Sequence, residues 1–121
     1  RVLKALSDGG VRVLMGTDAP QQFSVPGFSL HRELARMAEA GMTPYEILRT
    51  GTTNVGAYFE DVDTFGTVAP GRRADLVLLA DNPLDDVAHV TRPLGVMTRG
   101  RWLDRAALDA RLAAIAAQYA E

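Results

Sequence analysis

The chain has 121 residues, 47% of them hydrophobic and 23% charged, with a formal net charge of −2, which is typical of a folded globular domain and argues against binding to a nucleic-acid backbone. It has no cysteine, which excludes disulfides, thiolate metal ligands and cysteine nucleophiles. No apolar run approaches the roughly 20 residues of a membrane span and no signal peptide is visible, so we expect a cytoplasmic protein without membrane contact.

The first part of the chain predicts the end of an α/β unit. Val2, Leu3 and Leu6 share one face within the opening sequence "RVLKALSDGG" (1–10), which predicts the end of a helix that stops at Gly9 and Gly10. The nearly continuous apolar segment 11–15 predicts a strand covered on both faces, as in parallel sheets. A loop rich in proline follows over 17–28, and an amphipathic helix is expected from about 29 to 40.

The strongest local signal is the sequence "TPYE" (43–46). Thr43 can cap a helix, Pro44 suits the first helical position, and Glu46 can complete a capping box. We therefore expect a helix from Pro44 to about Arg49, followed by a second short helix that begins near Thr53.

Turn residues become frequent after residue 60, which predicts part of a small β-domain. Residues 74–80 are expected to form a buried strand, and residues 96–103 a hairpin that turns at Arg99 and Gly100. The remaining residues predict a helix capped by Asp104, with an apolar stripe of Leu108, Leu112, Ile115 and Tyr119 and an ion pair between Arg105 and Asp109.

We therefore divide the chain into 1–59, 60–104 and 105–121. A single parallel strand at 11–15 cannot satisfy its own edges, and the chain begins inside a predicted helix. For both reasons we expect it to be a fragment of a larger protein.

Asp18 is the main candidate for chemistry. An Asp just after a strand can simply cap a turn by accepting backbone N–H bonds. Yet the carboxyl end of a parallel strand is also where α/β enzymes place catalytic groups. The following loop offers Gln21 and Phe23, which could grip a ligand, and His31 opens the next helix at the same end. His31 can equally be a surface or packing residue.

A metal site cannot be completed by this chain alone. A catalytic zinc needs three protein ligands, and the sequence has no cysteine and only two histidines, in no paired motif. The chain could supply one ligand to a site whose other ligands lie elsewhere.

Several motifs in order resemble the C-terminal end of the amidohydrolase superfamily, in particular its imidazolonepropionase-like and Xaa-Pro dipeptidase-like members. They are "GVRVLMGTDAP" (10–20), "LHRELARMAEAGMTPYEILRTGTTNVGAYF" (30–59) and "FGTVAPGRRADLVLLADNPLDD" (65–86). The resemblance implies an α/β fold: the last strand and helices of a (β/α)8 barrel, part of a small composite β-sandwich, and a C-terminal helix.

The resemblance also implies a function. The parent protein would be a metal-dependent hydrolase of carbon–nitrogen bonds in non-peptide amides or dipeptides, with one or two divalent ions, expected to be Zn. Asp18 would be metal ligand and proton shuttle in the hydrolysis of a small amide-type substrate. The resemblance includes a histidine like His31 near the start of the following helix, and its role, substrate contact or support of the site, stays open. Together with His31, Gln21 and Phe23 of the loop are our candidates for substrate contact. The remaining ligands of the family are absent here, so the chain alone is expected to be inactive, and the full-length form could be a homo-oligomer.

Two other interpretations remain open. The chain could be a catalytically inactive structural fragment that needs a partner chain. It could also be a small β-type binding module, although the strand predicted at 11–15, which has no pairing strand in the sequence, argues against this interpretation.

Overall fold

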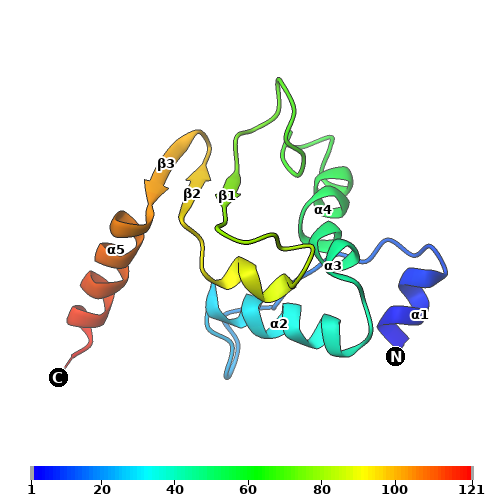
Figure 1. The fold of residues 1–121 in the computed structure, drawn as a ribbon, viewed down its shortest axis with the longest axis horizontal. Helices are drawn as coiled ribbons and strands as arrows, with labels where there is room; N and C mark the ends of the chain where they lie inside the picture. Colours follow the sequence, from blue (N-terminus) through cyan, green and yellow to red (C-terminus); the bar gives the residue numbers. More distant parts are fainter. Residues whose placement is uncertain (1, 121) are drawn as a thin grey trace.

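The computed structural model describes residues 2–120, and their two ends lie at opposite sides of the molecule (Figure 1). A helical layer lies beside a small sheet, with one helix at each end of the chain. Within residues 2–120, every helix is too short or too polar to cross a bilayer. The elements are α1 (Val2–Asp8), α2 (Phe28–Glu39), α3 (Pro44–Gly51), α4 (Thr53–Tyr58), β1 (Leu76–Leu78), η1 (Val87–Thr91), β2 (Gly95–Thr98), β3 (Arg101–Asp104) and α5 (Arg105–Gln118).

Helix α3 begins at the predicted capping box. The Thr43 hydroxyl accepts a hydrogen bond from the Glu46 backbone N–H at 3.3 Å, and the Glu46 carboxylate accepts one from the Thr43 N–H at 2.7 Å. These bonds satisfy two N–H groups that a helix start otherwise leaves free. The Thr43 N–H, then the Thr43 hydroxyl and Lys4, hold the pKa of Glu46 below its usual value.

The buried core lies between α2, α3 and the short helix η1. Ile47 is completely buried at its centre, with 0% of its surface exposed. The cluster consists of Leu34, Met37, Met42, Ile47 and Val87. Val87 joins the core although η1 is more than 35 residues away in sequence from α3. The sequence-based division at residue 60 stays a prediction, but these segments share one core.

The sheet has the order β1-β2-β3, with both pairs antiparallel. The hairpin β2–β3 and its turn at Arg99 and Gly100 are as predicted. Gly95 opens β2 under the Trp102 ring, where a Cβ atom would lie only 2.2 Å from a ring carbon. Glycine is thus required at this position for the indole to lie against the strand.

The predicted buried strand over 74–80 is only partly correct. A strand forms at Leu76–Leu78, but Val77 is 56% exposed and Leu78 is 52% exposed. Burial of an apolar strand requires a covering layer on each face, and no element within residues 2–120 covers these side chains.

Ion pairs of Arg73 hold the loop before β1 against the start of the sheet. Its guanidinium pairs with Asp63 and Asp75 and lies over the Phe65 ring at 4.6 Å from the centroid. Asp75 in turn accepts the Arg99 backbone N–H at 2.7 Å, which fixes the hairpin turn. This bond first, and Arg73 second, keep the pKa of Asp75 below its usual value.

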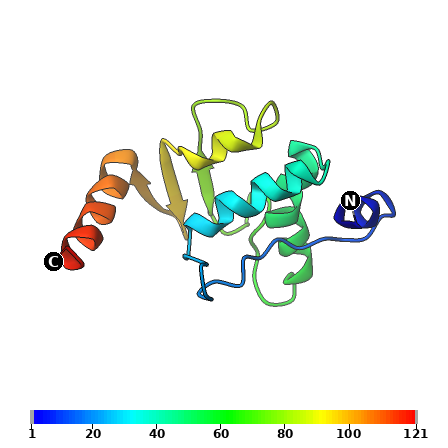
Figure 2. The same ribbon diagram turned by 90° about the horizontal axis from the view of Figure 1, so that it is seen from below.

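Helix α5 extends away from the sheet (Figures 1 and 2). Its cap is as predicted, because Asp104 accepts the Ala107 N–H at 2.8 Å, and Arg105 pairs with Asp109. The predicted apolar stripe forms no buried face, since the described part of α5 contains no buried residue and Tyr119, just after it, is 80% exposed.

Candidate functional site

Residues 11–17, which precede the candidate Asp18, form a segment outside the sheet. The strand predicted at 11–15 has no neighbour to pair with among the described residues, since ladder hydrogen bonds need an adjacent strand and residues 2–120 provide none for it. The predicted burial on both faces is not observed there either: one side is partly covered and the other is open.

Burial alternates from Arg12 to Ala19, as it does in a strand with one covered face, whereas Val11 before them is exposed. The partly buried side chains include Met15, which packs against the helical core, and the side chains between them are more exposed. The partly buried residues are Val13, Met15, Thr17 and Ala19, and the exposed residues are Arg12, Leu14, Gly16 and Asp18. We call the second set the open face; Asp18 therefore lies at its carboxyl end.

Helices α3 and α4 hold the segment in place. The Asn54 side-chain amide donates to the Val13 carbonyl at 2.9 Å, and the Thr50 carbonyl accepts the Met15 N–H at 3.0 Å. Met15 packs against the core over Gly51, where a Cβ atom would lie 2.2 Å from the Met15 methyl carbon. Sequence reasoning missed Asn54, because its partner is 41 residues away.

The backbone at Asp18 is left-handed, with φ of 53°. Among residues with a side chain, Asp and Asn tolerate this conformation best. The Gln21 side-chain amide donates a hydrogen bond to Oδ2 of Asp18, and the Ala19 N–H is 3.4 Å from the Thr17 hydroxyl. The carboxylate is therefore exposed but held on one side.

The other predicted site residues are placed separately from Asp18. Phe23 is 83% exposed, and His31 lies on α2 with its ring edge toward Phe28, at 6.4 Å between centroids. No hydrogen bond or aromatic contact among the described residues joins either of them to Asp18. Of the three predicted companions, the structure brings only Gln21 to the carboxylate.

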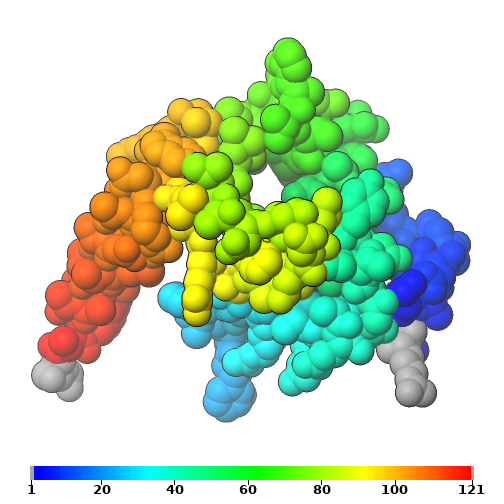
Figure 3. Space-filling view, in the orientation of Figure 1, coloured from blue at the N-terminus to red at the C-terminus, as the bar shows by residue number. Residues whose placement is uncertain are grey.

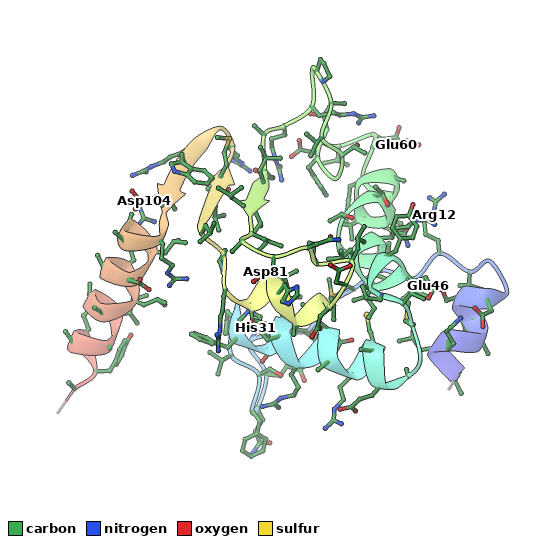
Figure 4. All side chains as sticks on the ribbon, in the orientation of Figure 1. Arg12, His31, Glu46, Glu60, Asp81 and Asp104 are labelled. Atoms are coloured by element: carbon green, nitrogen blue, oxygen red, sulfur yellow. The ribbon has the colours of Figure 1, made fainter. Side chains whose placement is uncertain are left out.

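His31 instead lines a hollow of about 520 Å³ between the helical layer and β1 (Figure 3). Its walls are mostly apolar and include Leu30, Leu48 and Val77. Figure 4 shows His31 on α2 and Arg12 beside α3, well apart in the molecule. The open face and this hollow are thus different surfaces.

The residues present fit one ligand of a metal centre. Within residues 2–120, no group of three His, Asp or Glu side chains lies close enough to hold an ion. On the open face, Asp18 is the residue whose side chain commonly binds metal, since its companions are Arg12, Leu14 and Gly16. A carboxylate with one oxygen held by an amide can still offer its other lone pairs to a cation.

The sequence matches the model of the amidohydrolase family over residues 1–103. Its fold is similar to that of a Xaa-Pro dipeptidase with methionine bound in the active site, with a TM-score of 0.72 and 23% identity over 85% of this chain and 25% of that one. Phenylurea hydrolase B is 29% identical with a TM-score of 0.71, over 88% of this chain and 27% of that one.

A protein identified as a prolidase from Bifidobacterium longum is 31% identical with a TM-score of 0.72, over 91% of this chain and 28% of that one. The chain thus spans about a quarter of the length of these solved structures. No curated protein sequence matches it.

Proposed function

The chain belongs to the amidohydrolase family, and from that premise we propose that it is the C-terminal portion of a metal-dependent hydrolase of carbon–nitrogen bonds in non-peptide amides or dipeptides. The position of Asp18 at the carboxyl end of the open face carries this proposal. The names of two similar structures, a Xaa-Pro dipeptidase and a phenylurea hydrolase, support the bond type.

In this proposal, residues 11–16 are the last strand of a (β/α)8 barrel, and α2 to α4 follow it. The partly buried Val13 and Met15 would then face the helices, while the open face would point into the barrel. The backbone N–H groups of Arg12 and Leu14 have no partner within the described residues, as expected of a strand whose neighbours come from another part of the protein. Strands β1 to β3 belong to a composite β-sandwich in the same way.

The carboxyl ends of barrel strands carry the active sites of this architecture, and Asp18 occupies that end. A bound divalent metal, which we expect to be one or two Zn ions, supplies a Lewis acid and lowers the pKa of a coordinated water. Asp18 would provide one ligand, and the other ligands would come from residues outside this chain.

Asp18 also has the chemistry of a proton shuttle. A carboxylate beside the attacking water can accept its proton and then deliver that proton to the leaving nitrogen. Its left-handed backbone and the bond from Gln21 fix where the carboxylate lies. The contact of Phe23 and His31 with substrate stays a prediction from the sequence, because no hydrogen bond or aromatic contact among the described residues joins either side chain to Asp18.

The proposal is tested on the full-length protein. We expect it to copurify with a divalent metal and to hydrolyse an alanyl-proline dipeptide or a phenylurea, and we expect a chelator to abolish the activity. Activity that survives complete removal of the metal would contradict the proposal.

The 121-residue chain provides a second test, by metal analysis together with size determination. We expect it to bind no metal tightly, because Asp18 is one ligand among several. A monomer that binds zinc tightly would contradict the assignment of the other ligands to a missing part. If the full-length protein binds no metal and hydrolyses neither compound, the inactive structural interpretation is favoured.

A further inference from the structure

We propose that Gln21 is a positioning residue that holds the Asp18 carboxylate in its working orientation. The inference rests on the proposed function of Asp18 and gives Gln21 a different role from the substrate contact expected from the sequence. Two observations support it: the hydrogen bond from Gln21 to Asp18, and the hydrogen bonds that hold the loop around Gln21 in place.

The contact leaves Asp18 only partly occupied. The Gln21 Nε2 donates to Oδ2 of Asp18, and no group within residues 2–120 donates to Oδ1. With φ of 53°, the Asp18 backbone directs its side chain differently from an ordinary strand residue. Oδ2 thus accepts the bond from Gln21, while Oδ1 has no donor among the described residues and is open to a cation or a water molecule.

The loop that contains Gln21 is itself hydrogen-bonded and leads into helix α2. The Gln21 carbonyl accepts the Ser24 N–H at 2.9 Å. Val25 and Ser29 then bind each other twice, because Val25 N–H donates to the Ser29 hydroxyl at 2.8 Å and Ser29 N–H donates to the Val25 carbonyl at 2.9 Å. These hydrogen bonds, together with the peptide bond between Ser24 and Val25, connect Asp18 through Gln21 to the first turn of a packed helix.

A neutral amide donor suits this task. It orients the carboxylate without adding the positive charge that Lys or Arg would bring beside a metal cation. Outer partners of this kind fix the orientation of ligands, and their loss typically costs about 10- to 100-fold in affinity or activity. A residue that binds substrate would instead change the Michaelis constant.

The test is Gln21→Glu in the full-length, Zn-loaded protein, assayed with alanyl-proline and a phenylurea. Glu has the same length but replaces the donor with a carboxylate that repels Asp18. We expect kcat to fall about 10- to 100-fold while KM stays within about twofold. Gln22→Glu is the matched control: it adds the same charge at the next residue, whose side chain makes no hydrogen bond within the described residues, and should keep kcat within about twofold.

Two kinetic results would overturn the inference. A higher KM with unchanged kcat would assign Gln21 to substrate binding, and equal losses in both variants would show that added charge alone is responsible. If the wild-type protein hydrolyses neither compound, the proposed function fails.

Crystal structures of the same full-length proteins decide the role of Gln21 in either case. We expect Gln21 to donate to Asp18 in the wild type, and the Asp18 carboxylate to turn in Gln21→Glu but not in Gln22→Glu. A wild-type Gln21 that points away from Asp18 would overturn the inference.

Discussion

The helical core and the open face differ in exposure, because the core encloses its residues and the open face leaves its residues exposed. Ile47 is completely enclosed among apolar side chains of α2, α3 and η1. Asp18 is exposed, although Met15 on the same extended segment packs against that core. One region is enclosed by the described residues, while the other is exposed, and in our proposal it faces a part of the protein outside this chain.

This contrast separates stability from chemistry. Core residues contribute through burial, so their replacement lowers the free energy of unfolding. Open-face residues contribute little to the packing of this chain, so their replacement should change turnover in the full-length protein and leave unfolding almost unaffected. A substitution in one region should therefore change its own property, stability or turnover, and leave the other property almost unchanged.

The largest effect is expected from Asp18→Asn in the full-length protein. Asn tolerates the left-handed backbone at this position, so the fold is retained. Loss of the proton acceptor should lower kcat by roughly 10²- to 10⁴-fold. We expect the melting temperature and metal content to stay close to those of the wild type, and a variant with full turnover would remove Asp18 from the reaction.

A substitution in the core should show the opposite behaviour. Ile47→Ala is expected to lower the free energy of unfolding by about 2–5 kcal/mol, because it leaves a cavity among well-packed neighbours. The protein that remains folded should keep its kcat. Leu84→Ala is the control, since Leu84 is exposed and its loss should cost less than about 0.5 kcal/mol. Equal destabilisation by both would contradict the core assignment.

Asn54 links the two regions and should affect both. Asn54→Ala leaves the Val13 carbonyl without its donor, which should cost about 1–3 kcal/mol and loosen the segment that carries Asp18. Thermal unfolding and kcat of the full-length protein should therefore decrease together. Loss of stability with unchanged kcat would show that the segment is held in place without Asn54.

The smallest effect concerns the sheet and depends on pH. The pKa of Asp75 is lowered in the fold, so its bonds to Arg99 and Arg73 stabilise the protein at pH above the ordinary value of 3.8. That stabilisation is lost as the pH falls through the lowered pKa. Asp75→Asn should thus reduce the melting temperature at neutral pH, and the difference from the wild type should disappear in acid.

Asp81→Asn controls for the change in charge, because Asp81 makes no hydrogen bond or ion pair in the part of the chain that the structure describes. Its melting temperature should follow that of the wild type at every pH. A pH-independent effect of Asp75→Asn would contradict the role given to its ionised form.

Local signals in the sequence predicted most of the helices and the hairpin. The capping box of Thr43 and Glu46 and the Asp104 cap lie within a few residues of the groups they satisfy, so their chemistry can be read directly. Helix η1 was missed, because five residues are too few to show a period, and with it the burial of Val87.

Features that depend on distant partners could not be predicted correctly. The strand at 11–15 was expected from its apolar residues, but pairing and burial on both faces require neighbours that residues 2–120 do not supply. The same holds for the exposed β1 side chains Val77 and Leu78. Asp18 was recognised as a candidate from its place after the strand, whereas the contact with Gln21 depends on how the turn folds.

The most direct test of the account is the anomalous scattering of zinc in crystals of the full-length protein. The account predicts a metal peak at about 2.0–2.2 Å from an Asp18 oxygen, with residues 11–15 hydrogen-bonded to a strand on each side. A metal bound away from Asp18, or an open face that remains in solvent in the complete protein, would contradict it.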